Sequence, residues 1–369
     1  MDETSSVAAV ATHSSESAGR SPLETFILED LESRRDELNT FSAAKSHIKL
    51  LLDAARRQRL RAQKIGWTST STFALYRSGA PVGGIYGRVT TLVSHQAQRT
   101  ASSRELTRQC LVLSEIPHLP GKTLHVTQDK AAVSFVERLG RPVSVRPAVR
   151  SIRAGISSNV STAENLTEAW DQAASACAKL PVIKQQIDVE TYLPWVPLRV
   201  FVVGEQAVAA VARVPLYVVG DGTRTLGQLT EAELTRRSAP AFLDPLKGVS
   251  AARLLKAQQL DADAVPPSGG LQLLTNDPQG QLGLGWSVDV LEQVSDSLVQ
   301  LAVNAMWAFA GLGATAVDIL TPALDSAENA VVSGVEPDAD LREFRFPAFG
   351  SSQYPNRAIM DRIAASNPR

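Results

Sequence analysis

Four short apolar segments follow one another between residues 182 and 219, and they constrain the fold more than any other feature of the sequence. They cover residues 182–189, 198–203, 207–211 and 216–219. Runs of this length that are rich in Val and bounded by Gly and charged residues are typical of β-strands. Helix patterns at 166–179 and 291–310 flank the region, and a further strand is expected at 314–320. The sequence therefore predicts an α+β (mixed α/β) fold, without an internal repeat and unlike a solenoid.

The chain has 369 residues, of which 44% are hydrophobic and 20% are charged, as is typical of a globular protein. Its 37 basic and 38 acidic residues leave a formal net charge of −1. A chain with this balance has no overall attraction to nucleic acid or to an anionic membrane. The composition therefore argues against a dedicated polyanion binder, and any phosphate must be bound locally.

The cysteines and histidines exclude several classes of site. Cys110 and Cys177 do not form a Cys-x-x-Cys pair, which excludes a disulfide framework and a cysteine-built zinc or iron–sulfur site. The five histidines are scattered, without an i,i+4 pair, and we interpret them as surface or packing residues. The acidic N-terminus lacks the features of an export signal, and no uncharged apolar run approaches the length of a bilayer span. We therefore expect a cytoplasmic protein.

The N-terminal third shows two further patterns. A helix is expected over residues 42–63, and the basic residues of its second half are interpreted as a solvated face. Residues 72–76 and 82–86 predict a β-hairpin around Ser78 and Gly79.

Common nucleotide-binding and acyl-transfer motifs are missing. Residues 120–123 carry only the end of the phosphate-binding Gly-x-x-x-x-Gly-Lys-Thr motif, because Ile116 stands where the first Gly belongs. Gly311 and Gly313 precede an expected strand, which favours a helix-to-strand turn over a dinucleotide-binding loop. There is no Gly-x-Ser-x-Gly elbow.

Several strings in one order nevertheless resemble a known family. The strings SSRELTRQCLVLSEIPHLPGKTLHVT and AAVSFVERLGRPVSVRP resemble the start of an ATP-grasp module. The string IDVETYLPWVPLRVFVVGEQAVAAVARVPLYVVGDGTRTLGQL resembles the adenine-hinge and palm region of cyanophycin-synthetase-type and glutathione-synthetase-like carboxylate–amine ligases. GLGATAVDILTP and YPNRAIMDRIAAS continue the similarity, which runs from about 98 to 365, with a weaker likeness over 42–97.

This resemblance implies an ATP-grasp fold with two α+β lobes, preceded by a smaller α/β domain. The expected divisions are a disordered tail at 1–21, an N-terminal α/β domain at 22–97, a first ATP-grasp lobe at 98–180 and a second lobe with a terminal helix at 181–369. It also implies ATP and Mg²⁺ as cofactors, and a reaction in which ATP phosphorylates a carboxylate and an amine attacks the acyl phosphate. The catalytic work is then placement of groups and neutralisation of charge.

The family's motifs assign roles to particular positions of this chain. For the nucleotide, the resemblance implies Arg104 and Arg146 at the phosphates, Glu190 at the ribose, and Ile187 and Val189 on the same strand. For catalysis, it implies Arg199 and Arg213 on the palm and Asp318 as a metal ligand. Asp318 also has independent weight, because a charge inside an apolar strand is costly unless it is paired or bound to metal. Asp221, in a Gly-Asp-Gly turn, is interpreted as a turn former.

The departures from the family pattern concern the phosphate and metal positions. Two lysines of the family are replaced here by Arg104 and Arg146, and the lid after Pro147 keeps Gly155 but has Arg150 and Arg153 in place of other glycines. Alignment of the second metal motif on Pro337 puts Val332 and Gly334 where oxygen ligands are needed. Acidic residues just downstream, which we interpret as an acidic surface loop, offer a substitute by a shift of register. They are Glu336, Asp338, Asp340 and Glu343.

Two hypotheses follow from this pattern. The first is a divergent or impaired ATP-dependent carboxylate–amine ligase acting on an amino acid or peptide. The second is a catalytically degenerate ATP-grasp protein that serves as partner or regulatory subunit of an active relative. Neither involves nucleic acid or a membrane, and both leave a homo-oligomer or a hetero-complex open.

Overall fold

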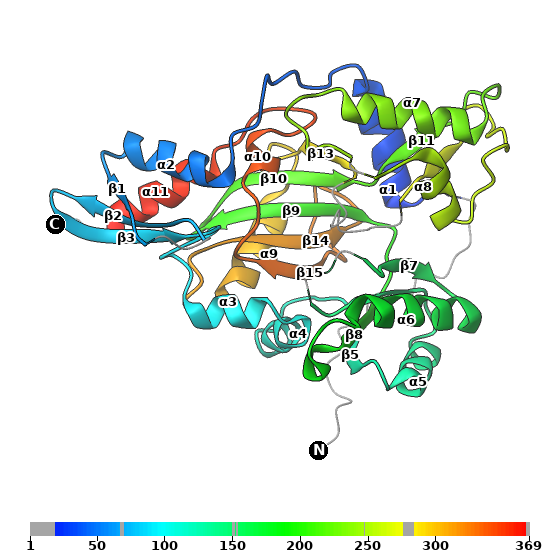
Figure 1. The fold of residues 1–369 in the computed structure, drawn as a ribbon, viewed down its shortest axis with the longest axis horizontal. Coiled ribbons are helices and arrows are strands. Elements are labelled where there is room, and N and C mark those ends of the chain that lie inside the picture. Colours follow the sequence, from blue (N-terminus) through cyan, green and yellow to red (C-terminus); the bar gives the residue numbers. More distant parts are fainter. Residues whose placement is uncertain are drawn as a thin grey trace.

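The computed structural model describes residues 19–66, 70–149, 152, 154–246, 248–275 and 284–366. It has helices and several antiparallel sheets, which confirms the predicted α+β class. Figure 1 shows a long central sheet with a smaller sheet at either end. None of the helices in these ranges combines the length and apolar composition that a bilayer span needs.

The N-terminal sheet has the order β1-β2-β3-β4 and packs against two helices from opposite ends of the chain. Its strands are β1 (Arg61–Lys64), β2 (Thr72–Arg77), β3 (Ala80–Tyr86) and β4 (Val89–Thr90), and its helices are α2 (His47–Arg57) and α11 (Pro355–Ser366). The β2–β3 hairpin confirms the predicted turn, in which Ser78 and Gly79 both have positive φ. The helix expected over 42–63 is wrong at its end: it stops at Arg57, Arg59 takes a left-handed conformation, and the chain then pairs with β2.

The small lobe contains the antiparallel sheet β5-β8-β6-β7, covered by two helices (Figure 1). Its strands are β5 (Gly121–His125), β6 (Val143–Pro147), β7 (Ser157–Val160) and β8 (Gln186–Thr191), its helices are α5 (Asp129–Leu139) and α6 (Ala163–Cys177), and η3 (Val182–Lys184) is a 3-10 turn. Strand β8 starts four residues later than the sequence predicts, because Val182 and Ile183 lie in the exposed η3 turn. Its core includes Trp170, Ile187 and Val189.

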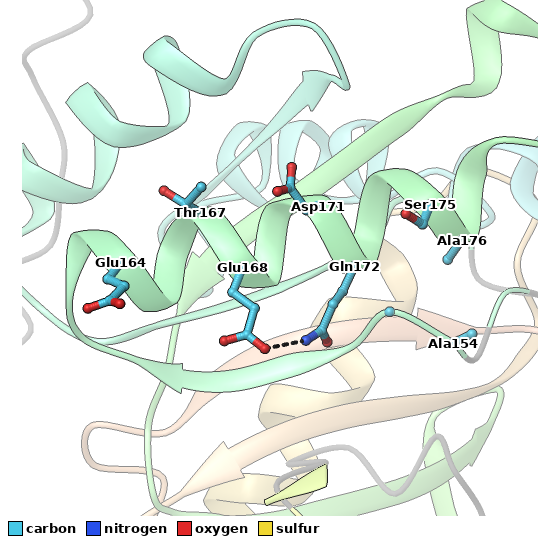
Figure 2. A pocket seen from close by; sticks show the side chains of 9 residues that line it. Ala154, Glu164, Thr167, Glu168, Asp171, Gln172, Ser175 and Ala176 are labelled. Atoms are coloured by element: carbon cyan, nitrogen blue, oxygen red, sulfur yellow. Dashed lines mark hydrogen bonds between the residues drawn. The ribbon is translucent and has the colours of Figure 1, made fainter. Parts of the chain in front are cut away.

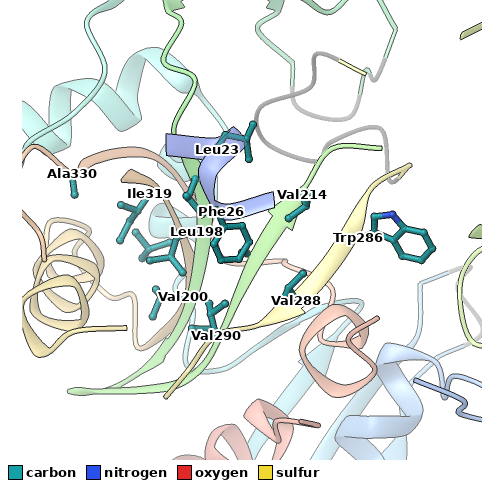
Figure 3. Packing of buried hydrophobic residues seen from close by; sticks show 14 of the residues in the cluster. Leu23, Phe26, Leu198, Val200, Val214, Trp286, Val288, Val290, Ile319 and Ala330 are labelled. Carbon is teal, nitrogen blue, oxygen red and sulfur yellow. The ribbon is translucent and has the colours of Figure 1, made fainter. Parts of the chain in front are cut away.

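The large lobe is organised around the central antiparallel sheet β13-β10-β9-β14-β15. Its strands are β9 (Val196–Val203), β10 (Gln206–Val214), β13 (Trp286–Asp289), β14 (Ala314–Thr321) and β15 (Val331–Glu336). Every residue of β9 and β14 is buried, as expected of strands covered on both faces. One face packs on α9 (Asp296–Trp307), α1 (Pro22–Thr25) and η1 (Phe26–Leu31), whose Leu23 and Phe26 lie against Leu198 and Val214 in Figure 3.

The remaining elements surround this sheet. They are η2 (Glu32–Arg34), α3 (His95–Ala101), α4 (Arg104–Leu113), β11 (Tyr217–Val219), α7 (Leu226–Ser238), α8 (Ala251–Ala257), β12 (Leu271–Leu273) and α10 (Arg342–Arg345). Helix α4 contacts β5 of the small lobe and β15 of the large lobe. It therefore lies where the two lobes meet.

Candidate functional site

Two groups of ion-paired side chains lie on either side of the contact between the lobes. We call the first the arginine cluster; it consists of Arg104, Arg108, Arg146, Asp188 and Glu190. We call the second the carboxylate cluster; it consists of Asp318, Glu336, Glu343, Arg199 and Arg213. Nine of these ten side chains are exposed over less than a fifth of their surface, with Glu336 as the exception. The sequence analysis singled out six of the ten as candidate site residues.

The arginine cluster is built by two regular periodicities. Along β8, alternate residues share a face, so Asp188 and Glu190 point the same way. On α4, Arg104 and Arg108 are four residues apart and therefore lie on one helical face. Arg146 is opposite Asp188 in the β6–β8 pairing, which brings a third guanidinium to the same place.

Both carboxylates of this cluster are paired. Asp188 Oδ1 accepts hydrogen bonds from Arg108 Nη2 at 2.6 Å and from Thr123 Oγ1 at 2.8 Å. Arg146 forms an ion pair with Glu190, and Arg104 lies 3.9 Å from each of the two carboxylates. Three arginines face two carboxylates here, so the cluster carries one excess positive charge.

Burial and neighbouring charges act in opposite directions on these groups. Burial lowers the pKa of Arg104, and the nearby Arg108 lowers it further, against the opposing effect of Asp188. Burial alone would raise the pKa of Asp188, but Arg108, Arg104 and Arg146 outweigh it and lower that pKa. Asp188 is therefore held as an anion at neutral pH.

The other two residues predicted on this strand lie elsewhere. Ile187 and Val189 are fully buried and pack in the hydrophobic core of the small lobe, on the face of β8 opposite to Asp188 and Glu190. Strand alternation therefore places both side chains in the core, and a role of these two positions in nucleotide binding stays a prediction. The sequence analysis missed Arg108, Asp188 and Thr123, although the i,i+4 and i,i+2 spacings from Arg104 and Glu190 were a usable signal.

The carboxylate cluster is centred on Arg199, whose side chain is only 3% exposed. Arg199 is directly opposite Asp318 in the β9–β14 pairing. Its Nε and Nη2 donate to the two oxygens of Asp318 at 2.6 and 2.8 Å, and its Nη1 donates to Glu343 Oε1 at 3.0 Å. Glu336 also accepts from Nη2. Burial alone would lower the pKa of Arg199, but these three carboxylates outweigh it and raise the pKa well above its usual value.

Arg213 completes the carboxylate cluster from strand β10. Its Nη2 and Nε donate to Glu343 Oε2 at 2.8 and 2.9 Å, and its Nη1 is 3.9 Å from Asp318. The structure thus brings Arg199, Arg213 and Asp318 together, as the sequence analysis expected for residues of one site.

The strand register also shows which residues of the second metal motif lie near Asp318. Asp318 is opposite Gly334, and Glu336 is two residues further along the same face of β15. The interpretation of residues 336–343 as an acidic surface loop is wrong for Glu336, Asp340 and Glu343, which are at most 30% exposed and are ion-paired. Asp338 is exposed, as predicted. Period-two alternation from Gly334 could have pointed to Glu336.

The residues present do not fit the magnesium ion that the resemblance implies. Both oxygens of Asp318 accept hydrogen bonds from Arg199, and Gly334 offers no side-chain ligand. No group of three His, Cys, Asp or Glu residues in the described ranges is arranged to hold a metal ion. Magnesium requires near-octahedral coordination by oxygen atoms. The carboxylate oxygens of Asp318 already accept hydrogen bonds from the guanidinium of Arg199.

Among the described residues, the gap between helix α4 and strands β8 and β15 is small. The gap lined by Arg104, Arg108, Glu190, Val332 and Ser333 has a volume of about 10 Å³. This is at most the room for a single water molecule. The donors match phosphate and ribose in kind, but a nucleotide enters only if the lobes separate and the ion pairs of the arginine cluster rearrange.

A larger cavity of about 220 Å³ lies next to the carboxylate cluster. Its walls include Arg199, Arg213 and Glu343, with Trp286 and Phe346 as apolar surface. Further charged residues of the wall are Arg88, Arg237, Asp244, Glu336, Asp340 and Arg342. The mixture of both charge signs with aromatic rings suits a small molecule that carries both a carboxylate and an amine.

The predicted lid is only partly described. Arg150 and Arg153 lie outside the described residues. Gly155 has φ +69°, and a Cβ there would come within 2.7 Å of the Gln172 carbonyl oxygen on α6. A glycine is therefore required at 155 for packing against α6. The open groove beside it, shown in Figure 2, is lined by Glu164, Glu168 and Asp171, which does not suit an anionic ligand.

The chain is similar in sequence to known proteins over more than half of its length. Over 235 residues, or 60% of the chain, the sequence is 26% identical to the cyanophycin synthetase of Trichormus variabilis, of which the match covers 24%. Over 218 residues, or 56% of the chain, it is 27% identical to the glutathione biosynthesis bifunctional protein GshAB of Pasteurella multocida, of which 27% is covered. The chain thus spans about a quarter of the length of these curated relatives. No family model matches the chain.

A crystal structure of a bifunctional glutathione synthetase from Pasteurella multocida superposes with a TM-score of 0.56 and 20% identity, covering 88% of this chain and 44% of that one. Together with the sheets described above, this similarity shows that the chain has the ATP-grasp fold. The resemblance to cyanophycin synthetase and to the glutathione-synthetase-like ligases is likewise confirmed. The domain divisions and the roles of single residues stay predictions.

Proposed function

We propose that this chain is a divergent ATP-dependent carboxylate–amine ligase, which forms an amide through an acyl phosphate and is slowed by its altered phosphate and metal positions. One observation carries the proposal: Arg199 and Arg213 lie side by side in the wall of a cavity of about 220 Å³, next to Asp318. The similarity to cyanophycin synthetase and GshAB supports the same class of reaction.

The substrate side of the reaction follows from the cavity. Arg213 pairs with Glu343 and lies at the wall, so a substrate carboxylate is expected to bind by exchanging places with that side chain. Guanidinium groups fixed in a partly buried site stabilise negative charge that develops on an acyl group. We expect an amino acid or a short peptide as substrate, because the wall carries both signs of charge.

The nucleotide side explains why the reaction is expected to be slow. ATP supplies the phosphoryl group when it is bound. Arg104, Arg108 and Arg146 are the groups that would neutralise its phosphates, and Glu190 would contact its ribose. These groups pair with one another in the closed arrangement, so nucleotide binding competes with internal ion pairs.

The test is release of ADP and phosphate over a panel of amino acids and short peptides. We expect slow, substrate-dependent release that is lost in Asp318→Ala and reduced in Arg213→Met. Arg224→Gln, on the exposed turn at Asp221, is the matched control and should keep full turnover. Absence of Mg·ATP binding by calorimetry at millimolar nucleotide contradicts the proposal.

A second candidate is a partner or regulatory subunit of an active ATP-grasp relative. It is favoured by the closed contact between the lobes, in which the arginine cluster and the carboxylate cluster are satisfied internally. Co-purification with an intact ATP-grasp chain that raises that chain's turnover supports this role. A lone monomer with turnover of its own argues against it. For either function we propose a cytoplasmic location, without nucleic acid or membrane.

A further inference from the structure

We propose that the guanidinium of Arg199 is the resident cation of the carboxylate cluster, so that this cluster is assembled without a divalent metal ion. The inference rests on the proposed function and extends it, because it states which group neutralises the carboxylates of the same site. It does not depend on turnover, because it concerns the protein without nucleotide.

The first argument is the number of donors that Arg199 uses. A guanidinium offers five N–H donors in a rigid planar fork. In Arg199, Nε, Nη1 and Nη2 all donate, to carboxylates on three different segments: Asp318 on β14, Glu336 on β15 and Glu343 on α10. One cation thus joins three anions, as a metal ion would.

The second argument is the position of Arg199. It stands directly opposite Asp318 in the two central strands, and it is almost fully buried. Opposite side chains in an antiparallel pair are held about 5 Å apart at Cβ. The guanidinium therefore meets the carboxylate of Asp318 by strand pairing alone, and no loop movement is needed to place it.

The third argument is charge. Three carboxylates face Arg199 and Arg213 in this cluster, which leaves one excess negative charge. Loss of Arg199 doubles that excess at a site where Asp318 is only 12% exposed. Buried charges without a counter-ion are strongly unfavourable, and a divalent cation would restore the balance.

The experiment replaces the guanidinium by an uncharged side chain of similar length. Arg199→Met is expected to melt at a lower temperature than wild type in EDTA, and its Tm should rise by about 5 °C in Mn²⁺ at roughly 100 times the dissociation constant. Wild type should show no such rise. Electron paramagnetic resonance should report Mn²⁺ bound to the variant and free in the presence of wild type.

Matched variants distinguish metal binding in place of Arg199 from the general destabilisation that any substitution in the cluster can cause. Arg213→Met raises the excess negative charge by the same amount, but both oxygens of Asp318 stay bound to Arg199, so it should show no metal response. Adding Asp318→Asn to Arg199→Met should abolish the response of the single variant. Both controls also lose a charged side chain of the cluster, so they account for destabilisation as such.

Two results overturn the proposal: stoichiometric Mn²⁺ binding by wild type, or a folded Arg199→Met protein that does not respond to metal. If Arg199→Met cannot be recovered folded, the wild-type titration decides alone. Binding there refutes the proposal, and Mn²⁺ that stays free at millimolar concentration supports it. No nucleotide is present, so the result is separate from success or failure of the ligase assay.

Discussion

The two clusters at the contact between the lobes are opposite in construction. In the arginine cluster, three guanidinium groups converge on two carboxylates, of which Asp188 is fully buried. In the carboxylate cluster, Asp318, Glu336 and Glu343 converge on Arg199. One cluster has an excess positive charge and the other an excess negative charge. The two excess charges are equal and opposite, so the two clusters together are neutral.

The two halves act on each other across the contact. Asp318 and Glu336 of the large lobe both favour the charged form of Arg104 on α4, and so oppose the fall in its pKa that burial causes. The gap that Arg104 and Glu190 line with Ser333 of the large lobe has a volume of about 10 Å³. Closure of the lobes is therefore stabilised by attraction between the clusters. Mutations that remove one charge from a cluster test how much the ion pairs within that cluster contribute to the stability of the protein.

The largest effect is expected from Asp188→Asn. Its loss leaves Arg104, Arg108 and Arg146 buried with Glu190 as the remaining carboxylate of the cluster. Breaking a buried ion pair by removing one partner typically costs about 3–5 kcal/mol. Urea unfolding monitored by circular dichroism should show this loss. A change below about 1 kcal/mol would mean that the arginines do not depend on Asp188.

The same carboxyl predicts a pH dependence. The folded pKa of Asp188 is lowered, so its stabilising effect is fully present above its unfolded pKa of about 3.9 and is lost as the pH falls through the folded pKa. The difference in stability between wild type and Asp188→Asn should be constant at neutral pH and should shrink below about pH 4. A difference that stays constant throughout acid unfolding would contradict the assignment.

A smaller effect is expected from Asp318→Ala, because Glu336 and Glu343 still neutralise Arg199. Loss of a charged hydrogen-bond partner in a buried site costs about 2–3 kcal/mol. The measurement is again urea unfolding, with Asp318→Asn as the control that keeps the volume of the side chain. If Asp318→Ala is more destabilising than Asp188→Asn, the ion pairs of the carboxylate cluster contribute more to the free energy of unfolding than those of the arginine cluster.

Arg213→Met is expected to cost about 1 kcal/mol, because Arg213 is partly exposed and Glu343 keeps its contact with Arg199. Thermal unfolding should show a small decrease in Tm. A loss as large as that of Asp188→Asn would show that Arg213, and not Arg199, organises the carboxylates.

The smallest effect is expected at an exposed pair. Asp221 Oδ1 accepts from the backbone N–H groups of Thr223 and Arg224, which confirms its interpretation as a turn former, and Arg224 Nε donates to Asp221. Exposed ion pairs contribute little to stability. Arg224→Gln should leave the unfolding curve unchanged, and it serves as the baseline for the four experiments above.

Local patterns in the sequence predicted more of the fold than of the site. The hairpin at Ser78 and Gly79 follows from turn chemistry, and the strands β9 and β14 follow from runs of Val and Ile. The helix over 42–63 was too long, because a helical pattern does not reveal that residues 61–64 find a strand partner in β2. The burial of Ile187 and Val189 on the face opposite to Glu190 could have been read from the alternation along the strand.

The sequence by itself determined which side chains share a face: Asp188 with Glu190 by the period of a strand, and Arg104 with Arg108 by the period of a helix. Only the tertiary structure decided which of them meet. Arg199 and Asp318 are 119 residues apart, and Arg199 and Glu343 are 144 residues apart. Their contacts depend on strand register and on the packing of α10 beside the sheet. Because those are set by the folding of the whole chain, no local pattern could show that the expected metal carboxylate is already bound by a guanidinium.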